Sequence, residues 1–158
     1  MDNLPISHEE NALSLLGGMP SVAAVRELEA HLLTLPQVDL ATNHVIHGGM
    51  CARTILFPAG VVLTGALTNC DNVCIVCGDI TVTTDEGPQR LAGYHVLPAK
   101  AGAKRAGVAH ADTWWTTIWP TSLTEIEAIE DEFTNESALL QTRRPLIEFS
   151  NHKALEMA

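Results

Sequence analysis

The spacing of apolar residues divides the chain into a helical start, a β-rich middle and a helical end. From Ser21 to Leu35, apolar residues recur every three or four positions, with charged residues between them. This period is typical of an amphipathic helix, and Pro36 marks a position where such a helix must have stopped. We therefore predict an N-terminal helix of about three to four turns that begins near Ser21.

Between Val38 and Thr121 the apolar period shortens. Short stretches rich in Val, Ile and Thr alternate with turn-forming sequences such as PAG, DEGP and PAKAG. Many short strands with closely spaced turns favour an antiparallel sandwich or barrel over a βαβ fold. One hairpin is predicted to turn at Asp85-Glu86-Gly87.

After Pro120 the pattern becomes helical and acidic. Thr124 and Glu127 have the spacing of a capping box, which predicts the start of a second helix. An apolar stripe runs along this predicted helix and consists of Ile126, Ile129 and Phe133. We interpret the acidic residues of 125–133 as a solvated face without a catalytic role.

These regions form one domain with two arms. We assign residues 1–37 to an N-terminal arm and helix, residues 38–121 to the barrel, and residues 122–158 to a C-terminal helix and arm. A length of 158 residues suits a single core. We expect both arms to pack on the barrel or to grip a neighbouring chain.

The charge balance excludes some classes of partner. The chain has 19 acidic and 9 basic residues, for a formal net charge of −10, so it repels nucleic acids and anionic membranes. It shows no basic leader and no apolar run long enough to span a bilayer, which predicts a protein of the cytosol. In that reducing compartment the four cysteines are expected to be thiols, and we interpret Cys70, Cys74 and Cys77 as core residues.

Several stretches in a fixed order carry a resemblance to a known family. They are LLTLPQVDL, HVIHGGMCARTILFPAGVVLTG, GDITV, PAKAGAKRAGVAHADTWWTTI and TEIEAIEDE. Together, over roughly residues 28–133, they resemble small cupin-like proteins of the RmlC type found in tailed phages and prophages. The resemblance implies an all-β fold, a cupin-type jelly-roll barrel, flanked here by the N-terminal amphipathic helix and the short acidic C-terminal helix and arm.

The resemblance also implies the place of a metal site, and this sequence departs from the pattern there. In metal-using cupins one strand supplies two histidines and an acidic or amide residue, and a later strand supplies another histidine. The matching positions here are Thr68, Asn72, Cys74 and Arg105. A hydroxyl and a neutral amide are poor ligands and a guanidinium repels a cation, so we expect a degenerate pocket that binds no cofactor.

Two other hypotheses for the pocket stay open. In the first, His95 and His110 form a displaced site with Cys74 for Fe, Mn, Ni or Zn, and the protein is a mononuclear metal-dependent cupin enzyme. In the second, Arg105 faces into a metal-free barrel and binds a small anion. Arg105 could equally be an exposed loop charge paired with Asp112 or with the acidic helix.

The tryptophans suggest a contact surface. Trp115 is expected in the core, whereas Trp114 and Trp119 fall on or near the alternate register, so that at least one of them should face outward and mark a subunit interface. Our leading hypothesis is a non-catalytic, phage-encoded structural or binding protein that self-associates as a homo-oligomer. We expect it in the host cytoplasm and, as decoration or connector beside other virion proteins, in the virion, with neither nucleic acid nor membrane as a partner.

Overall fold

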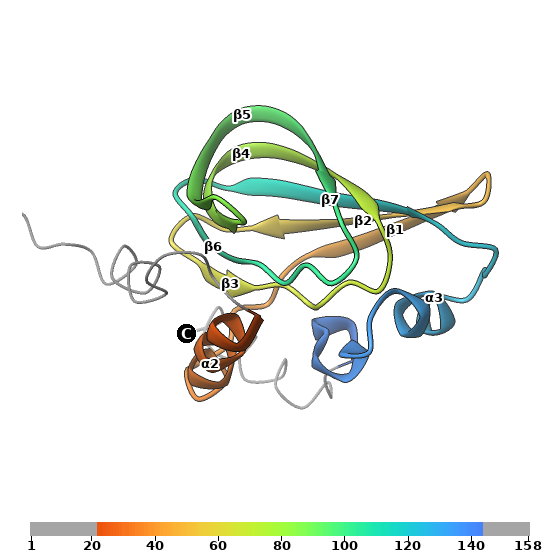
Figure 1. Cartoon of the computed structure of the whole chain (residues 1–158), viewed down its shortest axis with the longest axis horizontal. Coiled ribbons are helices and arrows are strands. Elements are labelled where there is room, and N and C mark those ends of the chain that lie inside the picture. Colours follow the sequence, from red (N-terminus) through yellow and green to blue (C-terminus); the bar gives the residue numbers. More distant parts are fainter. Residues whose placement is uncertain (1–21, 144–158) are drawn as a thin grey trace, which may run out of the picture.

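The computed structural model describes residues 22–143, which form a strongly curved antiparallel sheet with helical segments along its open side (Figure 1). In chain order the elements are α2 (Val22–Leu32), β1 (Thr42–His47), β2 (Met50–Phe57), β3 (Val62–Thr64), β4 (Asn72–Thr84), β5 (Gly87–Ala99), β6 (Ala106–Ala109), β7 (Thr113–Pro120), α3 (Ile126–Phe133) and the 3₁₀ turns Ser137–Leu139 and Gln141–Arg143. The prediction of an all-β fold with an N-terminal helix and a short acidic C-terminal helix is confirmed.

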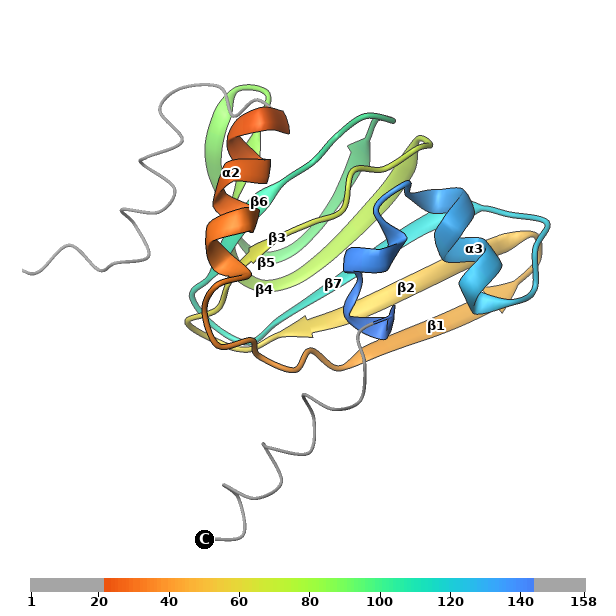
Figure 2. The same ribbon diagram turned by 90° about the horizontal axis from the view of Figure 1, so that it is seen from below.

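The curvature of the sheet comes from the long strand β4. The strand order is β1-β2-β7-β4-β6-β3, and β5 pairs with β4 outside this path. The first half of β4 pairs with β7 and its second half, from Ile80, pairs with β6. Gly78 lies between the halves with φ 149°, and a Cβ there would collide with Thr113 of β7, so only glycine permits this close approach. The sheet therefore curls into a half-barrel whose concave side faces the helices (Figure 2).

The hairpin predicted at residues 85–87 is present. Strands β4 and β5 pair along their whole length, and the last pair before the turn is Thr84 with Gly87. The Thr84 hydroxyl donates to the Gly87 carbonyl oxygen at 2.7 Å, and Gly87 adopts φ 106°. The turn residues of the sequence thus fix the register of the longest strand pair in the sheet.

The predicted N-terminal helix is confirmed as α2. Its residue Val25 is fully buried and packs with Ala106 and Val108 of β6. The helix therefore covers the β3–β6 end of the half-barrel, as Figure 2 shows.

The C-terminal helix differs from the prediction in three respects. Glu125, and not Thr124, is the N-cap of α3 and makes no side-chain capping bond, so the predicted capping box is wrong. Ile129 and Phe133 are buried while Ile126 is largely exposed. The acidic face is not wholly solvated either, because Glu130 is almost completely buried.

The described parts of both arms pack on the barrel of their own chain. A single buried ammonium joins them: Lys104 Nζ donates to Glu29 of α2 at 2.9 Å, to Glu136 at 2.8 Å and to the carbonyl oxygen of Gly65 at 2.9 Å. All three donors of the ammonium are therefore used, and its side chain is fully buried. The outer parts of the predicted arms, residues 1–21 and 144–158, lie outside the described residues.

Replacing Lys104 by methionine should destabilise the fold strongly. The substitution keeps the aliphatic stem but leaves the Glu29 and Glu136 carboxylates without their shared cation, which typically costs about 3–5 kcal/mol. Urea unfolding measures this loss. The matched control is Arg26→Met, which removes an ion pair with Glu136 whose arginine side chain is 54% exposed and should cost less than about 1 kcal/mol. Equal losses in the two variants would contradict the assigned role of Lys104.

Candidate functional site

The strand register places a polar row across the concave face of the half-barrel. His44 of β1 lies opposite Arg53 of β2, Arg53 opposite Thr117 of β7, and Thr117 opposite Cys74 of β4. Directly opposed residues of neighbouring strands point to the same face of a sheet. The neighbouring inward positions are mostly apolar, with Thr42 and Asn72 as polar exceptions.

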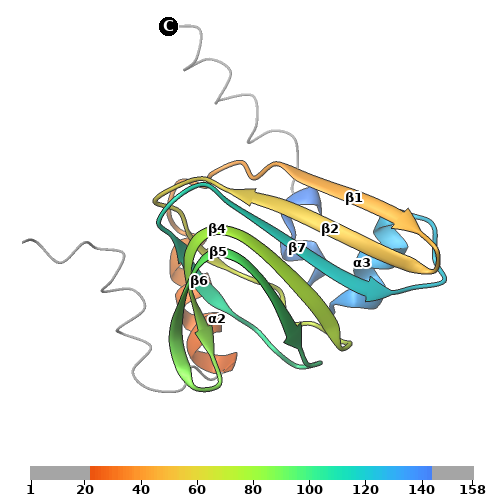
Figure 3. The ribbon, with the colours of Figure 1, turned by 90° about the horizontal axis from the view of Figure 1, so that it is seen from above.

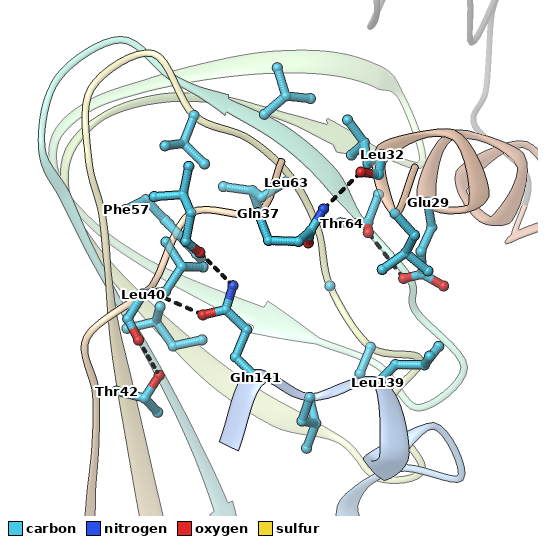
Figure 4. A pocket seen from close by; sticks show the side chains of 18 of the residues that line it. Glu29, Leu32, Gln37, Leu40, Thr42, Phe57, Leu63, Thr64, Leu139 and Gln141 are labelled. Atoms are coloured by element: carbon cyan, nitrogen blue, oxygen red, sulfur yellow. Dashed lines mark hydrogen bonds between the residues drawn. The ribbon is translucent and has the colours of Figure 1, made fainter. Parts of the chain in front are cut away.

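A cavity of about 370 Å³ lies between this face and its cover. Its wall includes Arg53, Ile55 and Phe57 of β2, whose side chains share the inward parity of that strand. Figure 4 shows Gln141 reaching across from the C-terminal segment: its Oε1 accepts from the Leu40 amide at 2.8 Å, while its Nε2 donates to the Val38 carbonyl oxygen at 2.7 Å. Segments from both ends of the chain thus close the cavity.

The acidic side of the cavity is held by the Lys104 contacts. Glu29 Oε2 accepts from the Thr64 hydroxyl at 3.0 Å (Figure 4). It also accepts from Lys104 Nζ at 2.9 Å. Glu136 Oε2 accepts from the Leu67 amide at 2.9 Å and from Lys104 at 2.8 Å. Both carboxylates line the cavity, but their Oε2 atoms accept hydrogen bonds from groups of the protein.

The Arg53 guanidinium lies on the opposite wall without such partners. Its Nε is buried, and among residues 22–143 it has no hydrogen-bond partner. Burial lowers the pKa of Arg53, and the nearby Glu130 carboxylate acts in the opposite direction. Arg53 is not among the site residues predicted from the sequence. The signal was present, because Arg53 shares its parity on the strand with the buried residues Cys51 and Phe57.

Glu130 of α3 is already bound by the C-terminal segment. Its Oε1 accepts from the Thr142 hydroxyl at 2.7 Å and its Oε2 accepts from Arg143 Nε at 2.8 Å. His44 Nε2 lies 3.5 Å from Oε1. Burial, and next the charge of Arg53, lower the pKa of His44, while Glu130 raises it. The net lowering favours a neutral imidazole beside the Arg53 cation.

The structure brings together part of the pocket predicted from the resemblance. The Cys74 thiol donates to Asn72 Oδ1 at 3.4 Å, and Asn72 Nδ2 donates to the Cys70 carbonyl oxygen at 3.1 Å. Burial raises the pKa of Cys74, and the charge of Arg105 acts against it, which places Arg105 near this thiol. Thr68 lies apart in the loop before β4, where its hydroxyl donates to the Lys100 carbonyl oxygen at 3.5 Å. A protonated thiol, a committed amide and a cation do not fit a metal ion.

The displaced metal site is not assembled. His95 Nε2 lies 2.8 Å from the Ala92 carbonyl oxygen, and His110 Nε2 lies 2.7 Å from the Thr81 hydroxyl. Thr81 sits between two inward-facing buried residues of β4, so His110 lies on the outer face, whereas Cys74 faces inward. Within residues 22–143, no group of three or more His, Cys, Asp or Glu side chains is arranged to hold a metal. The structure therefore does not bring His95, His110 and Cys74 together.

The three tryptophans occupy different environments. Trp119 is fully buried and its ring stacks on Phe133 of α3, with ring centroids 4.0 Å apart. Because α3 covers this end of the concave face, Trp119 is not available as an exposed interface residue. Trp114 is 51% exposed on the outer face, and Trp115 packs against the core as expected.

Solved structures with a similar course of the chain include three bacterial or archaeal proteins. A cupin superfamily protein from Desulfitobacterium hafniense DCB-2 has 16% identity, a TM-score of 0.45 and coverage of 59% of this chain and 87% of its own. An RmlC-like cupin family protein from Methanocaldococcus jannaschii has 12% identity, a TM-score of 0.43 and coverage of 52% and 81%. KdgF from Halomonas sp. has 18% identity, a TM-score of 0.45 and coverage of 53% and 82%. No family model and no curated protein matches the chain.

Neither described helix, α2 nor α3, is long and apolar enough to cross a membrane.

The buried imidazole should make stability depend on pH. Because the pKa of His44 in the folded chain lies below its ordinary value of 6.5, the unfolded chain binds this proton more readily. The free energy of unfolding should therefore fall as the pH drops below 6.5 toward the folded pKa, by at most about 1.4 kcal/mol per pH unit.

Urea unfolding at a series of pH values above about 5 measures this slope, and His44→Gln should flatten it. The exposed His110 provides the matched control, since His110→Gln should leave the contribution of His44 in place. A wild-type slope that survives in His44→Gln would show that another group is responsible.

Proposed function

We propose that this chain is a non-catalytic binding protein, a cupin-like barrel whose concave cavity holds a small organic molecule. The observation that carries the proposal is the cavity itself. Its volume of about 370 Å³ lies within the range of ligand pockets. Aliphatic side chains form most of its wall, as is usual for sites that take up small molecules.

The chemistry of the polar residues supports binding over catalysis. The positions that would hold a metal in the related fold carry Thr68, Asn72 and Arg105, none of which suits a cation site in the surroundings described above. The carboxylates of Glu29, Glu130 and Glu136 all accept hydrogen bonds from protein groups. They are therefore poor candidates for a free general acid or base.

An uncharged probe tests the cavity directly. N-phenyl-1-naphthylamine fluoresces on entering apolar sites, and we expect saturable binding of one molecule per chain. The Leu63→Trp substitution fills the cavity from β3 and should weaken this binding by roughly tenfold or more. The matched control, Gln89→Trp, adds the same ring at an exposed position of β5 outside the cavity and should bind like the wild type. No saturable binding, or equal binding by both variants, would contradict the proposal.

The outer face of the sheet favours a second role, self-association. Figure 3 shows β1, β2, β7, β4 and β5 side by side, with the helices beyond them. At the outward positions of β1, β2, β7, Val73–Cys77 and Tyr94–Pro98, no residue is Asp, Glu, Lys or Arg. Large apolar side chains are exposed there: Val45, Met50, Val73, Tyr94, Val96 and Trp114.

We propose that a second copy of the chain covers this outer face. Copies with a net charge of −10 repel each other, and a face without charged side chains is where that repulsion is smallest. Tyr94 is 67% exposed and Trp114 51% exposed, and the two lie on either side of Cys77 in one cross-strand row. Exposed apolar patches of this kind commonly mark protein contacts.

Light scattering after size exclusion tests self-association. We expect a wild-type oligomer that dissociates at least roughly tenfold more readily in Val96→Glu, because the new carboxylate would be buried in the contact. Gln89→Glu adds the same charge at an exposed position of β5 outside the face and should leave the oligomer intact. A wild-type protein that is monomeric at roughly 100 μM would contradict the proposal.

The prediction of a phage-encoded, virion-associated protein rests on the resemblance of the sequence, and we retain it as part of this proposal. An antibody against the chain should then detect it in purified particles beside other virion proteins. Detection only in the cleared lysate would contradict a place in the virion.

A further inference from the structure

We infer that the ligand of the cavity is a small monocarboxylate with an apolar body, and that the guanidinium of Arg53 binds its carboxylate. The inference rests on the proposed binding function and specifies its ligand class. It names a different residue from Arg105, which the sequence suggested for an anion.

Arg53 has a hydrogen-bond donor that the protein leaves without a partner. Its side chain lines the cavity, and its buried Nε has no hydrogen-bond partner within residues 22–143. An arginine presents five N–H donors in a planar fork, which matches the two oxygens of a carboxylate. A cation removed from water without such partners is costly, so an anionic ligand would supply what the protein does not.

The nearby carboxylate of Glu130 already accepts hydrogen bonds from other residues. Glu130 influences Arg53 electrostatically, but its two oxygens accept from Thr142 and Arg143 at 2.7 Å and 2.8 Å. The neighbour of Arg53 on β1 is His44, whose lowered pKa favours the neutral form and so does not balance an anion or compete for one. Neither neighbour therefore provides a hydrogen bond to the buried Nε of Arg53.

The charges that line the cavity limit the ligand to one anionic group. The other charged lining residues are Glu29 and Glu136, which would repel a second negative charge. Gln141 uses its side-chain amide on the Val38–Leu40 segment. Most of the remaining wall is aliphatic or aromatic, as at Ile55 and Phe57, and its other polar side chains, Gln37, Thr42 and Thr64, are uncharged. A ligand with one carboxylate at Arg53 and an apolar body against this wall matches both the charged and the apolar lining of the cavity. A dianionic phosphate would have only one arginine to balance its two charges.

Octanoate and octan-1-ol are suitable probes, because they share an apolar chain and differ in the charged group. Isothermal titration calorimetry should show octanoate binding to the wild type at least roughly tenfold more tightly than octan-1-ol, since a hydrogen-bonded charge pair adds that much discrimination. Arg53→Met keeps an unbranched apolar stem and removes the charged guanidinium. It should lose this preference, while octan-1-ol binds within about twofold of the wild type.

Two further variants separate the causes. Arg53→Lys keeps the charge but not the fork, and should recover only part of the octanoate preference. Arg90→Met is the matched control, because Arg90 forms an exposed ion pair with Asp79 on the sheet and should bind octanoate like the wild type. Circular dichroism reports whether each variant is folded. The comparison of octanoate with octan-1-ol on the wild type tests the inference even if a variant fails to fold.

The outcomes distinguish this inference from the proposed function. If octan-1-ol binds as tightly as octanoate, or if Arg53→Met keeps the octanoate affinity, the carboxylate assignment is wrong and the cavity remains a binding site. If neither ligand nor the uncharged fluorescent probe binds the wild type, the proposed function fails as well.

Discussion

The concave cavity depends on the buried ammonium of Lys104. An open half-barrel exposes its inner face unless something covers it, and here the cover comes from α2 at one end of the chain and from residues around Glu136 at the other. Lys104 donates to one carboxylate from each segment and to the β3–β4 loop, so three distant parts of the sequence share one cation. With all three of its donors satisfied, the ammonium can remain buried, and the cover closes without filling the space beneath it.

A second charged group shapes the opposite wall in a different way. Glu130 belongs to α3 and binds Thr142 and Arg143, so the buried Nε of Arg53 lies near a negative charge but has no hydrogen bond to it. The electrostatic attraction helps to keep the guanidinium inside the fold, and the missing hydrogen bonds leave it able to take a ligand. In place of the histidines of a metal site, the inner face offers a thiol, a neutral imidazole and a cation. That donor set suits an anion better than a metal ion.

Local features of the fold could be predicted from the sequence, and features that depend on distant contacts could not. The helix of Val22–Leu32 and the turn at residues 85–87 follow from apolar period and turn residues that lie within a few positions of each other. The burial of Glu130 depends on Arg143 in a later segment and on His44 of β1. No pattern of neighbouring residues in the sequence could therefore predict it. The strand pattern left open which of Trp114 and Trp119 faces outward, because Phe133, which covers Trp119, belongs to a separate helix. The inward position of Arg53 could have been predicted, because Arg53 falls on the same alternate positions of its strand as the buried residues Cys51 and Phe57.

The most direct test of this account is a crystal structure of the protein grown with octanoate. The account predicts density for one octanoate molecule in the cavity, with both carboxylate oxygens at about 2.8–3.0 Å from nitrogens of Arg53 and the alkyl chain against Ile55 and Phe57. A structure in which Arg53 instead turns away to pair with Glu130, and the cavity holds no octanoate, would contradict it.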